Sequence, residues 1–311
     1  MNISYYFDNL RRRWAVRQFN KAAAGVMETP PPLVLGKDGP MLLSMVHHRD
    51  VLPYLLALKS FAQHLLPSRV VVVADKTIDA SDEAMFRQQV PEIELRRAHE
   101  FERPGVPVGG TWERLMAIAH YVSEAYVIQL DADTMTLADI DHVVDCFKKN
   151  VSFTIGTYDL QAKVSATEVS RWAQSHCKTY ASPHIQLVCE AALLTAAAAG
   201  DPSKFYIRGC SGFAGFGRGS FSPDDLVALS KRMQQQVGDA WAKWGTEQFA
   251  SNFVVANIPG SEVLPHPVYT TPNKIDHTTA FVHFIGPHRY LKGIYLKEAN
   301  RFLGRIHRAK A

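Results

Sequence analysis

The chain has 311 residues, of which 47% are apolar and 21% are charged. This composition is that of a folded globular protein with room for one large α/β domain or two smaller ones. It contains no apolar run long enough to span a membrane, and its basic N-terminus lacks the apolar segment of a secretory signal. The four cysteines show no CxxC spacing, which indicates free thiols in a reducing compartment and predicts a cytoplasmic location.

The net charge of +4 is concentrated at the two ends of the chain. Residues 1–21 carry five Lys or Arg against one acidic residue, and residues 288–311 carry seven against one. Both ends also hold apolar residues at helical spacing, which predicts two basic helices. Such helices either pack on the domain, which is the simpler expectation, or lie against an anionic membrane surface, such as the inner face of a cell membrane. They lack a nucleic-acid-binding motif, so nucleic acid is not an expected partner.

The first half of the chain alternates short β-branched runs with amphipathic stretches. A basic helix and a Pro/Gly-punctuated connector fill residues 1–40. The order that follows is βαβαβαβ, which predicts an α/β fold with right-handed crossovers and a mostly parallel central sheet flanked by helices. The expected strands are 41–46, 68–75, 92–97 and 126–130, and the expected helices between them are 51–65, 80–90 and 111–125.

The second half of the chain is less regular. Thr246 is expected to cap the helix that follows it. A glycine-rich stretch at 209–221 is predicted as a strand or loop, and it is no dinucleotide fingerprint because it lacks GxGxxG. The expected helices are 165–180, 183–199, 224–237, 247–257 and a basic C-terminal helix at 294–311, and the last expected strand is 279–284.

The segment YVIQLDADTMTL (126–137) ends a buried strand with two carboxylates, Asp131 and Asp133. Residues two apart in a strand point to the same side, where their charges repel unless a cation lies between them. Mn²⁺ and Mg²⁺ prefer oxygen ligands, and ligands bind at the carboxyl ends of parallel strands. The alternative is a loop that caps a following helix, with Asp133 or Thr134 accepting backbone N–H bonds.

This layout resembles a GT-A glycosyltransferase and is most similar to family 8, which includes glycogenin and the lipopolysaccharide galactosyltransferases. The resemblance spans residues 41–293, with a nucleotide-binding half (41–137) and a half for the acceptor and sugar (138–293). LDADTMTL is similar to the family's LDADTLVL, whose acidic pair holds Mn²⁺ on the diphosphate of a nucleotide sugar. The resemblance assigns Asp131 and Asp133 to the metal, and Asp131 also to the ribose.

A second motif, HFIGPHR (283–289), resembles the family's HxxGxxK. It implies that His283 is the third metal ligand and that Gly286 lets the phosphates approach closely. Arg289 stands where the family has Lys, and it is expected at the diphosphate together with Lys292. The exchange keeps the charge but replaces a point donor with a fork. A lone histidine at a strand end is more often packed than ligating, but the two acidic partners favour the metal role.

Two further stretches resemble the parts of the family that line the sugars. GCSGFAGF (209–216) is similar to the family's FNSGVMLF-type segment and implies that Ser211 and Gly212 line the donor, with Cys210 in the usual Asn position. WGTEQFASN (244–252) is similar to the family's DQDxLN segment. It places Glu247 and Gln248 as catalytic candidates facing the donor sugar.

Each of these candidates has a structural alternative. Glu247 stands at a predicted helix start, where an acidic side chain commonly serves as a cap. Arg114, on the helix before the acidic pair, matches a basic residue that the family uses near the nucleotide, but it could equally lie on a solvated helix face.

The resemblance implies a Mn²⁺- or Mg²⁺-dependent transferase that moves a hexose from a UDP-sugar to a saccharide, lipid-linked or other hydroxyl acceptor. An inverting reaction needs a carboxylate base, for which Glu247 is the candidate. Family 8 enzymes retain the anomeric configuration, and Gln248 would then be a neighbour of the reacting face.

Two other functions are alternatives to this one. One is a catalytically idle GT-A-like module that binds a sugar or nucleotide. The other is a haloacid-dehalogenase-type phosphatase, whose DxDx[TV] motif is not matched because Met135 holds the fifth position and the motif lies in mid-chain.

Overall fold

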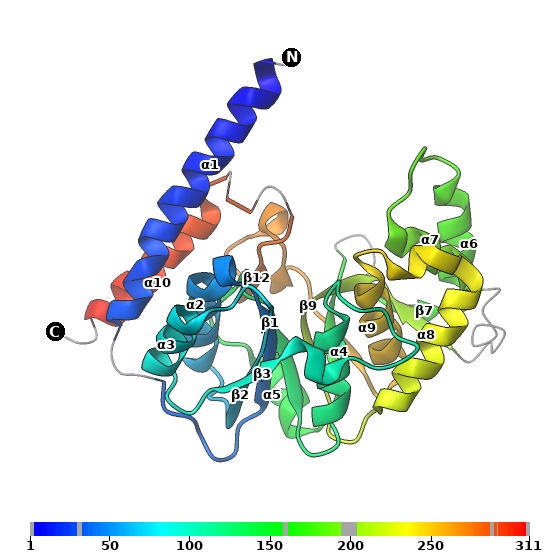
Figure 1. The fold of residues 1–311 in the computed structure, drawn as a ribbon, viewed down its shortest axis with the longest axis horizontal. Coiled ribbons are helices and arrows are strands. Elements are labelled where there is room, and N and C mark those ends of the chain that lie inside the picture. The colour runs from blue at the N-terminus through cyan, green and yellow to red at the C-terminus, as the bar shows by residue number, and fades with distance from the viewer. Residues whose placement is uncertain are drawn as a thin grey trace.

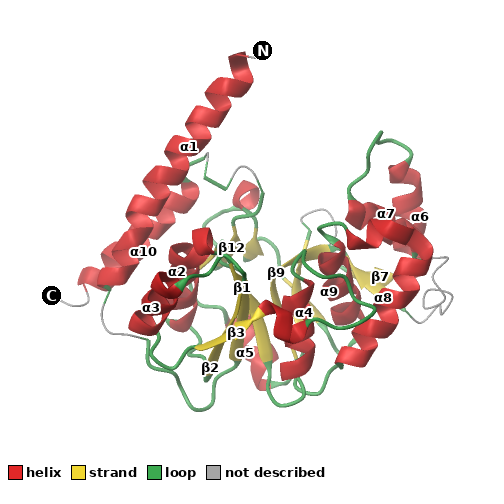
Figure 2. Cartoon of the chain, in the orientation of Figure 1, coloured by secondary structure: helices red, strands yellow, loops and turns green. Residues whose placement is uncertain are grey.

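A seven-stranded sheet forms the centre of the protein, with helices on both faces (Figure 1; Figure 2). The computed structural model describes residues 3–29, 33–157, 161–193, 204–286, 289–290 and 292–308. Its helices are α1 (Ile3–Ala23), α2 (Val51–Ala62), α3 (Ala80–Gln89), α4 (Trp112–Tyr121), α5 (Asp141–Lys148), α6 (Ala166–Cys177), α7 (Ile185–Ala192), α8 (Pro223–Val237), α9 (Thr246–Asn257) and α10 (Ile294–Arg308). Its strands are β1 (Met41–Val46), β2 (Arg69–Ala74), β3 (Glu94–Arg97), β4 (Val127–Leu130), β5 (Thr134–Thr136), β6 (Phe153–Gly156), β7 (Lys163–Ser165), β8 (Phe205–Ile207), β9 (Gly209–Phe216), β10 (Glu262–Leu264), β11 (Tyr269–Thr270) and β12 (Phe281–His283).

The order of strands in the main sheet is β10-β6-β9-β4-β1-β2-β3. The pairs β4–β1, β1–β2, β2–β3 and β10–β6 are parallel, whereas β9 runs antiparallel to both of its neighbours, β4 and β6. The predicted α/β fold with a mostly parallel sheet is therefore confirmed. A small sheet, β11-β12-β5, lies beside the end of β4 and brings the chain after β12 next to the acidic pair.

Two hydrophobic clusters fill the space between the sheet and its helices. Residues 70–73 of β2 are continuously apolar because the two faces of the strand contact different clusters. Val70 and Val72 face the first cluster, and Val71 and Val73 face the second. The first cluster includes side chains of α2, α3 and α10, and the second includes side chains of α4, α8 and α9. Both faces of the sheet are therefore buried, as parallel strands require.

Most predicted elements are found, with boundaries that differ by a few residues. β1 matches its predicted range of 41–46, and the glycine-rich stretch forms β9. The prediction that Thr246 caps α9 is wrong. The N-cap is Gly245, whose φ of 104° a glycine adopts without steric cost, and the Thr246 hydroxyl instead accepts a bond from Trp112 Nε1 (3.0 Å). Residues 194–199 of one predicted helix, residues 309–311 of another and residues 30–32 of the connector lie outside the described residues.

The two basic ends lie side by side as α1 and α10, on the outside of the first cluster (Figure 1). The ring of Phe19, on α1, is buried with its centroid 4.1 Å from that of Tyr295, on α10. Ala299, Phe302 and Leu303 are also buried, so the expectation that the C-terminal helix packs on the domain is confirmed. The N-terminal part of α1 projects beyond the rest of the molecule. Among the helices that the structure describes, none is long and apolar enough to cross a membrane.

Candidate functional site

The loop Asp131–Asp133 joins β4 to β5 and is held from three sides. The Asp131 N–H donates to the Gly212 carbonyl (2.9 Å), and the Thr134 hydroxyl donates to the Asp131 carbonyl (2.8 Å). The Tyr295 hydroxyl, from α10, donates to the carbonyl of Ala132 (3.1 Å). Since a strand follows this loop and the Thr134 hydroxyl donates to a carbonyl, the alternative of a helix-capping loop is wrong.

Asp131, Asp133 and His283 form a cluster with the chemistry of a metal site. Each offers one ligand atom, and the three atoms lie within 4.8 Å of one another. His283 reaches the cluster because β12 pairs antiparallel with β5 and sets it opposite Thr134. His283 Nε2 lies 3.1 Å from Asp133 Oδ1. Two carboxylates and an imidazole suit Mn²⁺ and similar divalent ions, so the residues present fit a metal of this class.

His283 is fixed between Asp133 and β9. Its Nδ1 lies 3.3 Å from Cys210 Sγ, and a Cβ added to Gly212 would lie 1.9 Å from its Cε1. The glycine at position 212 therefore makes room for the imidazole. Burial lowers the pKa of His283, but the Asp133 carboxylate and Cys210 outweigh it and raise this pKa well above its ordinary value. The imidazole must lose a proton to bind a metal, so protons and metal compete at His283.

The Arg289 side chain spans two carboxylates. Nη1 donates to Asp133 Oδ2 and Nη2 to Asp50 Oδ1, each at 2.9 Å. Gly286 precedes it with a φ of 80°, a conformation that favours glycine. Burial raises the pKa of Asp133, but His283 and Arg289 together hold it at about 2, so this carboxylate stays ionised at neutral pH. Sequence reasoning missed Asp50, although it follows the carboxyl end of β1, where ligands of parallel sheets bind.

Arg114 links the acidic loop to α9 in the interior of the protein. Its side chain donates from Nη1 to Asp131 and from Nη2 to Glu247 Oε2, the second bond being 3.0 Å long. Arg114 is only 3% exposed, so the alternative of a solvated helix face is wrong. Burial raises the pKa of Asp131 and of Glu247, and the Arg114 guanidinium partly offsets this in both.

Glu247 is 2% exposed and is held by side chains. Besides Arg114, the hydroxyls of Thr111 (3.1 Å) and Ser211 (3.2 Å) donate to Oε2, so the carboxylate does not serve as a helix cap. Oε1 is buried without a hydrogen-bond partner in the described part of the chain. Thr111 was missed in the sequence; its φ of 73° is unusual for a residue other than glycine, but a sequence carries no mark of it.

The next residue, Gln248, belongs to a chain of polar contacts. Its Nε2 donates to Gln186 Oε1 (2.6 Å), and Gln186 Nε2 donates to Glu190 Oε1 (3.0 Å). Glu190 is fully buried, and burial raises its pKa to about 7 although Arg208 lies 3.3 Å away and opposes the shift.

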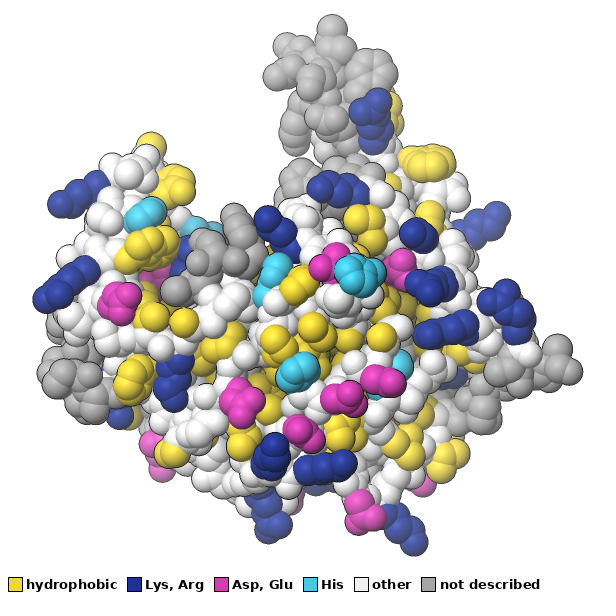
Figure 3. Space-filling model, turned by 180° about the vertical axis from the view of Figure 1, so that it is seen from behind, with side chains coloured by type: hydrophobic (Ala, Val, Ile, Leu, Met, Phe, Trp, Pro, Cys, Tyr) yellow, Lys and Arg dark blue, Asp and Glu magenta, His cyan; other side chains and the backbone are white. Residues whose placement is uncertain are grey.

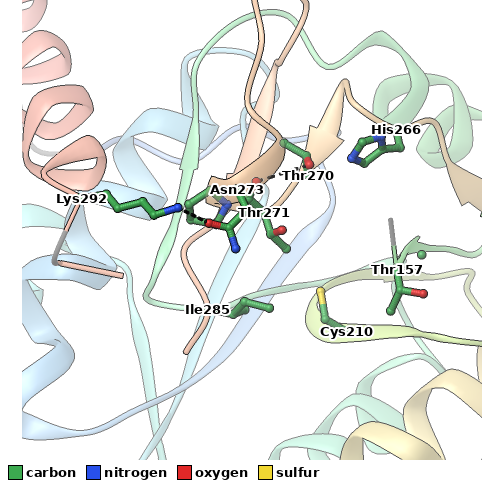
Figure 4. A pocket seen from close by; sticks show the side chains of 10 residues that line it. Thr157, Cys210, His266, Thr270, Thr271, Asn273, Ile285 and Lys292 are labelled. Carbon is green, nitrogen blue, oxygen red and sulfur yellow. Dashed lines mark hydrogen bonds between the residues drawn. The ribbon is translucent and has the colours of Figure 1, made fainter. Parts of the chain in front are cut away.

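Most of the predicted site residues line one cavity of about 380 Å³. They are Asp131, Asp133, His283, Arg114, Ser211, Gly212, Glu247, Gln248 and Gly286. Lys292 lies on a different cavity, of about 240 Å³, where its Nζ donates to Asn273 Oδ1 (2.7 Å; Figure 4). Cys210 lines both cavities, so the two adjoin. Arg289 lies on a third cavity.

The fold is similar to that of a solved glycosyltransferase structure. The galactosyltransferase LgtC, solved in complex with donor and acceptor sugar analogs, matches 85% of this chain with 95% of its own at a TM-score of 0.51 and 11% identity. The chain has the GT-A fold. Mouse xyloside xylosyltransferase 1 matches at a TM-score of 0.43 and 14% identity. That match covers 78% of this chain and 97% of the xylosyltransferase. No family model matches the sequence, and no curated protein matches it.

The GT-A fold accounts for the position of the site. The acidic loop lies at the carboxyl end of β4, beside the ends of β1 and of the antiparallel β9, where ligands of an α/β sheet bind. An identity of 11% carries the fold but not the substrate. The function of this chain therefore depends on its own side chains.

Proposed function

We propose that this protein is a metal-dependent glycosyltransferase that moves a hexose from a nucleotide sugar, with a UDP-sugar as the expected donor, to a hydroxyl group of an acceptor. The observation that carries the proposal is the cluster of Asp131, Asp133 and His283 at the end of β4 in a GT-A fold. An imidazole beside the acidic pair is not part of the DxDx[TV] phosphatase motif, and a measurement of turnover separates a transferase from an idle binding module.

The metal-binding residues and Arg289 act on the leaving group. Asp131, Asp133 and His283 would hold Mn²⁺ or Mg²⁺, which when bound stabilises the charge that develops on the departing diphosphate. Arg289 adds a fixed positive charge next to Asp133, in a fork that suits phosphate oxygens. Gly286 lines the same cavity without a side chain, so a phosphate can approach its backbone.

Glu247 and Gln248 act on the sugar side of the same cavity. The contacts of Glu247 favour a positioning role, because one oxygen accepts bonds from Arg114, Thr111 and Ser211 and such bonds stabilise the charged form. Through Arg114, Glu247 also orients Asp131. Gln248 is then the candidate neighbour of the reacting face in a retaining reaction, and Glu247 becomes the base only if the reaction inverts.

The acceptor is proposed to be a saccharide or a lipid-linked hydroxyl compound. The lipid-linked case is supported by the basic side chains that α10 keeps exposed, including Lys297, Arg301 and Arg305. Lys and Arg side chains gather over the arm formed by α1 and α10 (Figure 3). Each cation near an anionic membrane contributes about 1 kcal/mol of attraction, so this arm supports a peripheral contact with such a surface.

A thermal-shift measurement with UDP and GDP, each with and without Mn²⁺, tests the proposal. UDP with Mn²⁺ should raise the midpoint, since a ligand at one hundred times its Kd adds about 2.7 kcal/mol to the free energy of unfolding. Excess EDTA or Asp133→Asn should abolish both this shift and Mn²⁺-dependent hydrolysis of a UDP-sugar. No shift with either nucleotide would contradict the proposal, and a shift without any hydrolysis or transfer would indicate an idle binding module.

A further inference from the structure

A third cavity, of about 410 Å³, also contains Asp133 in its lining and is bounded on one side by the N-terminal helix. It is lined by four separate parts of the chain: α1, the segment after β1, the loop between β4 and β5, and the segment after β12. The lining residues are Arg12, Val16, Asn20, Arg49, Asp50, Asp133, Gly286, Arg289 and Tyr290. α1 precedes β1 in the chain and lies outside the central α/β unit (Figure 1). Its side chains nevertheless line a cavity that shares Asp133 and Gly286 with the candidate site.

Three arginines surround this cavity, and they differ in how they are paired. Arg289 is bound to Asp50 and Asp133. Arg49 lies 3.3 Å from Asp50 and its side chain is 80% exposed, so this pair is weak. Arg12 has neither an ion pair nor a hydrogen bond with any residue in the described part of the chain.

The charges around the cavity match a phosphate group. The guanidinium groups of Arg12, Arg49 and Arg289 exceed the carboxylates of Asp50 and Asp133 by one charge. A divalent ion bound to Asp133 would add positive charge on the same side. Arginine forks bind phosphate oxygens in pairs, and charge-assisted bonds of this kind are among the strongest in proteins.

We propose that Arg12, together with Arg49 and Arg289, binds a phosphate-bearing group in this cavity, so that α1 is part of the ligand site. The source of the phosphate rests on the proposed function: it is either the diphosphate of the nucleotide-sugar donor or a phosphate carried by the acceptor. The packing of Phe19 against Tyr295 holds α1 in place for this role. Asn20, two turns from Arg12 on the same side of the helix, adds a neutral donor and acceptor to the wall.

The test measures binding of inorganic pyrophosphate by calorimetry to the full chain, to Arg12→Ala and to Arg11→Ala. Arg11 is the matched control, because it is exposed on the same helix, carries the same charge and does not line the cavity. Arg12→Ala should weaken pyrophosphate binding about tenfold, while Arg11→Ala should leave it nearly unchanged. Arg12→Lys should restore part of the loss, since it keeps the charge without the fork. Equal melting midpoints would confirm that neither variant alters the fold.

Binding of UDP to the same variants identifies the source of the phosphate. A parallel loss of UDP affinity in Arg12→Ala assigns the site to the donor diphosphate, whereas a loss for pyrophosphate alone assigns it to a phosphorylated acceptor. Equal pyrophosphate binding by Arg12→Ala and Arg11→Ala, or no binding by the unaltered chain, would overturn the inference. Either result leaves the proposed transferase function intact as long as UDP with Mn²⁺ still stabilises the protein.

Discussion

Gly212 shows how a single residue determines the geometry of the candidate metal site. Its missing side chain leaves the space that the His283 ring occupies, since an added Cβ would lie 1.9 Å from that ring. Gly212→Ala should therefore displace His283 and weaken Mn²⁺ binding about tenfold or more, as disturbed ligand support does in other metal sites. Calorimetric titration of Mn²⁺ measures this.

A double-mutant cycle separates this effect from a direct role of Gly212 at the substrate. In a His283→Ala background, Gly212→Ala should cause no further loss of Mn²⁺ affinity, because there is no ring left to displace. An equal loss in both backgrounds would show that the glycine serves the approach of a ligand, as its resemblance to the family segment implies.

Glu190 gives a prediction about pH. Its pKa in the folded protein is about 7 because of burial, above the ordinary value of 4.5. The folded state therefore holds a proton that the unfolded state has lost between pH 4.5 and 7, and the free energy of unfolding falls across this range. Between pH 4 and pH 8, the free energy of unfolding of Glu190→Gln should rise by about 3 kcal/mol relative to that of the unaltered chain. Urea unfolding at several pH values tests this, and a constant difference would show that Arg208 fully compensates the burial of the carboxylate.

At the scale of elements, α1 packs on the domain through a few buried side chains, of which Phe19 is the largest. Phe19→Ala should lower the free energy of unfolding by about 3 kcal/mol, since it opens a cavity between α1, Tyr290 and Tyr295. Trp14→Ala is the matched control on the same helix; its side chain is 64% exposed, so the change should stay within about 0.5 kcal/mol. Comparable losses for both variants in denaturant unfolding would contradict this packing of α1.

The elements that the sequence could predict are those with a clear period. The strand at 41–46 and the alternation of strands and helices up to β4 follow from buried runs and amphipathic stretches. β5, β7, β8, β10 and β11 have only two or three residues, too few to show a period. The short helix α5, whose eight residues cover little more than two turns, was also missed.

The candidate site likewise contains residues that the sequence could predict and contacts that it could not. The acidic pair and His283 stand out because each ends a strand within a short motif. The bond between Arg114 and Glu247 joins residues 133 positions apart, and no local sequence pattern predicts it. The pairing of Arg289 with Asp50 spans 239 positions. Such contacts depend on how the whole sheet assembles.

At the scale of the whole molecule, the C-terminal helix has a buried and a charged side. Removing residues 297–311 would take Ala299, Phe302 and Leu303 out of the core, and we expect the shortened chain to lose its fold. A membrane role is better tested by reversing charge on the exposed side. Arg301→Glu with Arg305→Glu should keep the fold and reduce sedimentation with anionic vesicles, because two attractive charges become repulsive. Unchanged sedimentation would restrict α10 to packing, and neutral vesicles serve as the control.

The hydrogen bond from Tyr295 to Ala132 determines which residues a chimaeric protein must include to retain this site. The residues that resemble other glycosyltransferases end near position 293, yet a hydroxyl from α10 holds the peptide between the two candidate metal-binding carboxylates. A chimaera that grafts residues 41–293 onto foreign flanking helices would carry every recognisable motif and still lack this contact. The smallest portable unit of the site therefore extends through α10, and with it the aromatic ring of Phe19 on α1 that packs against Tyr295.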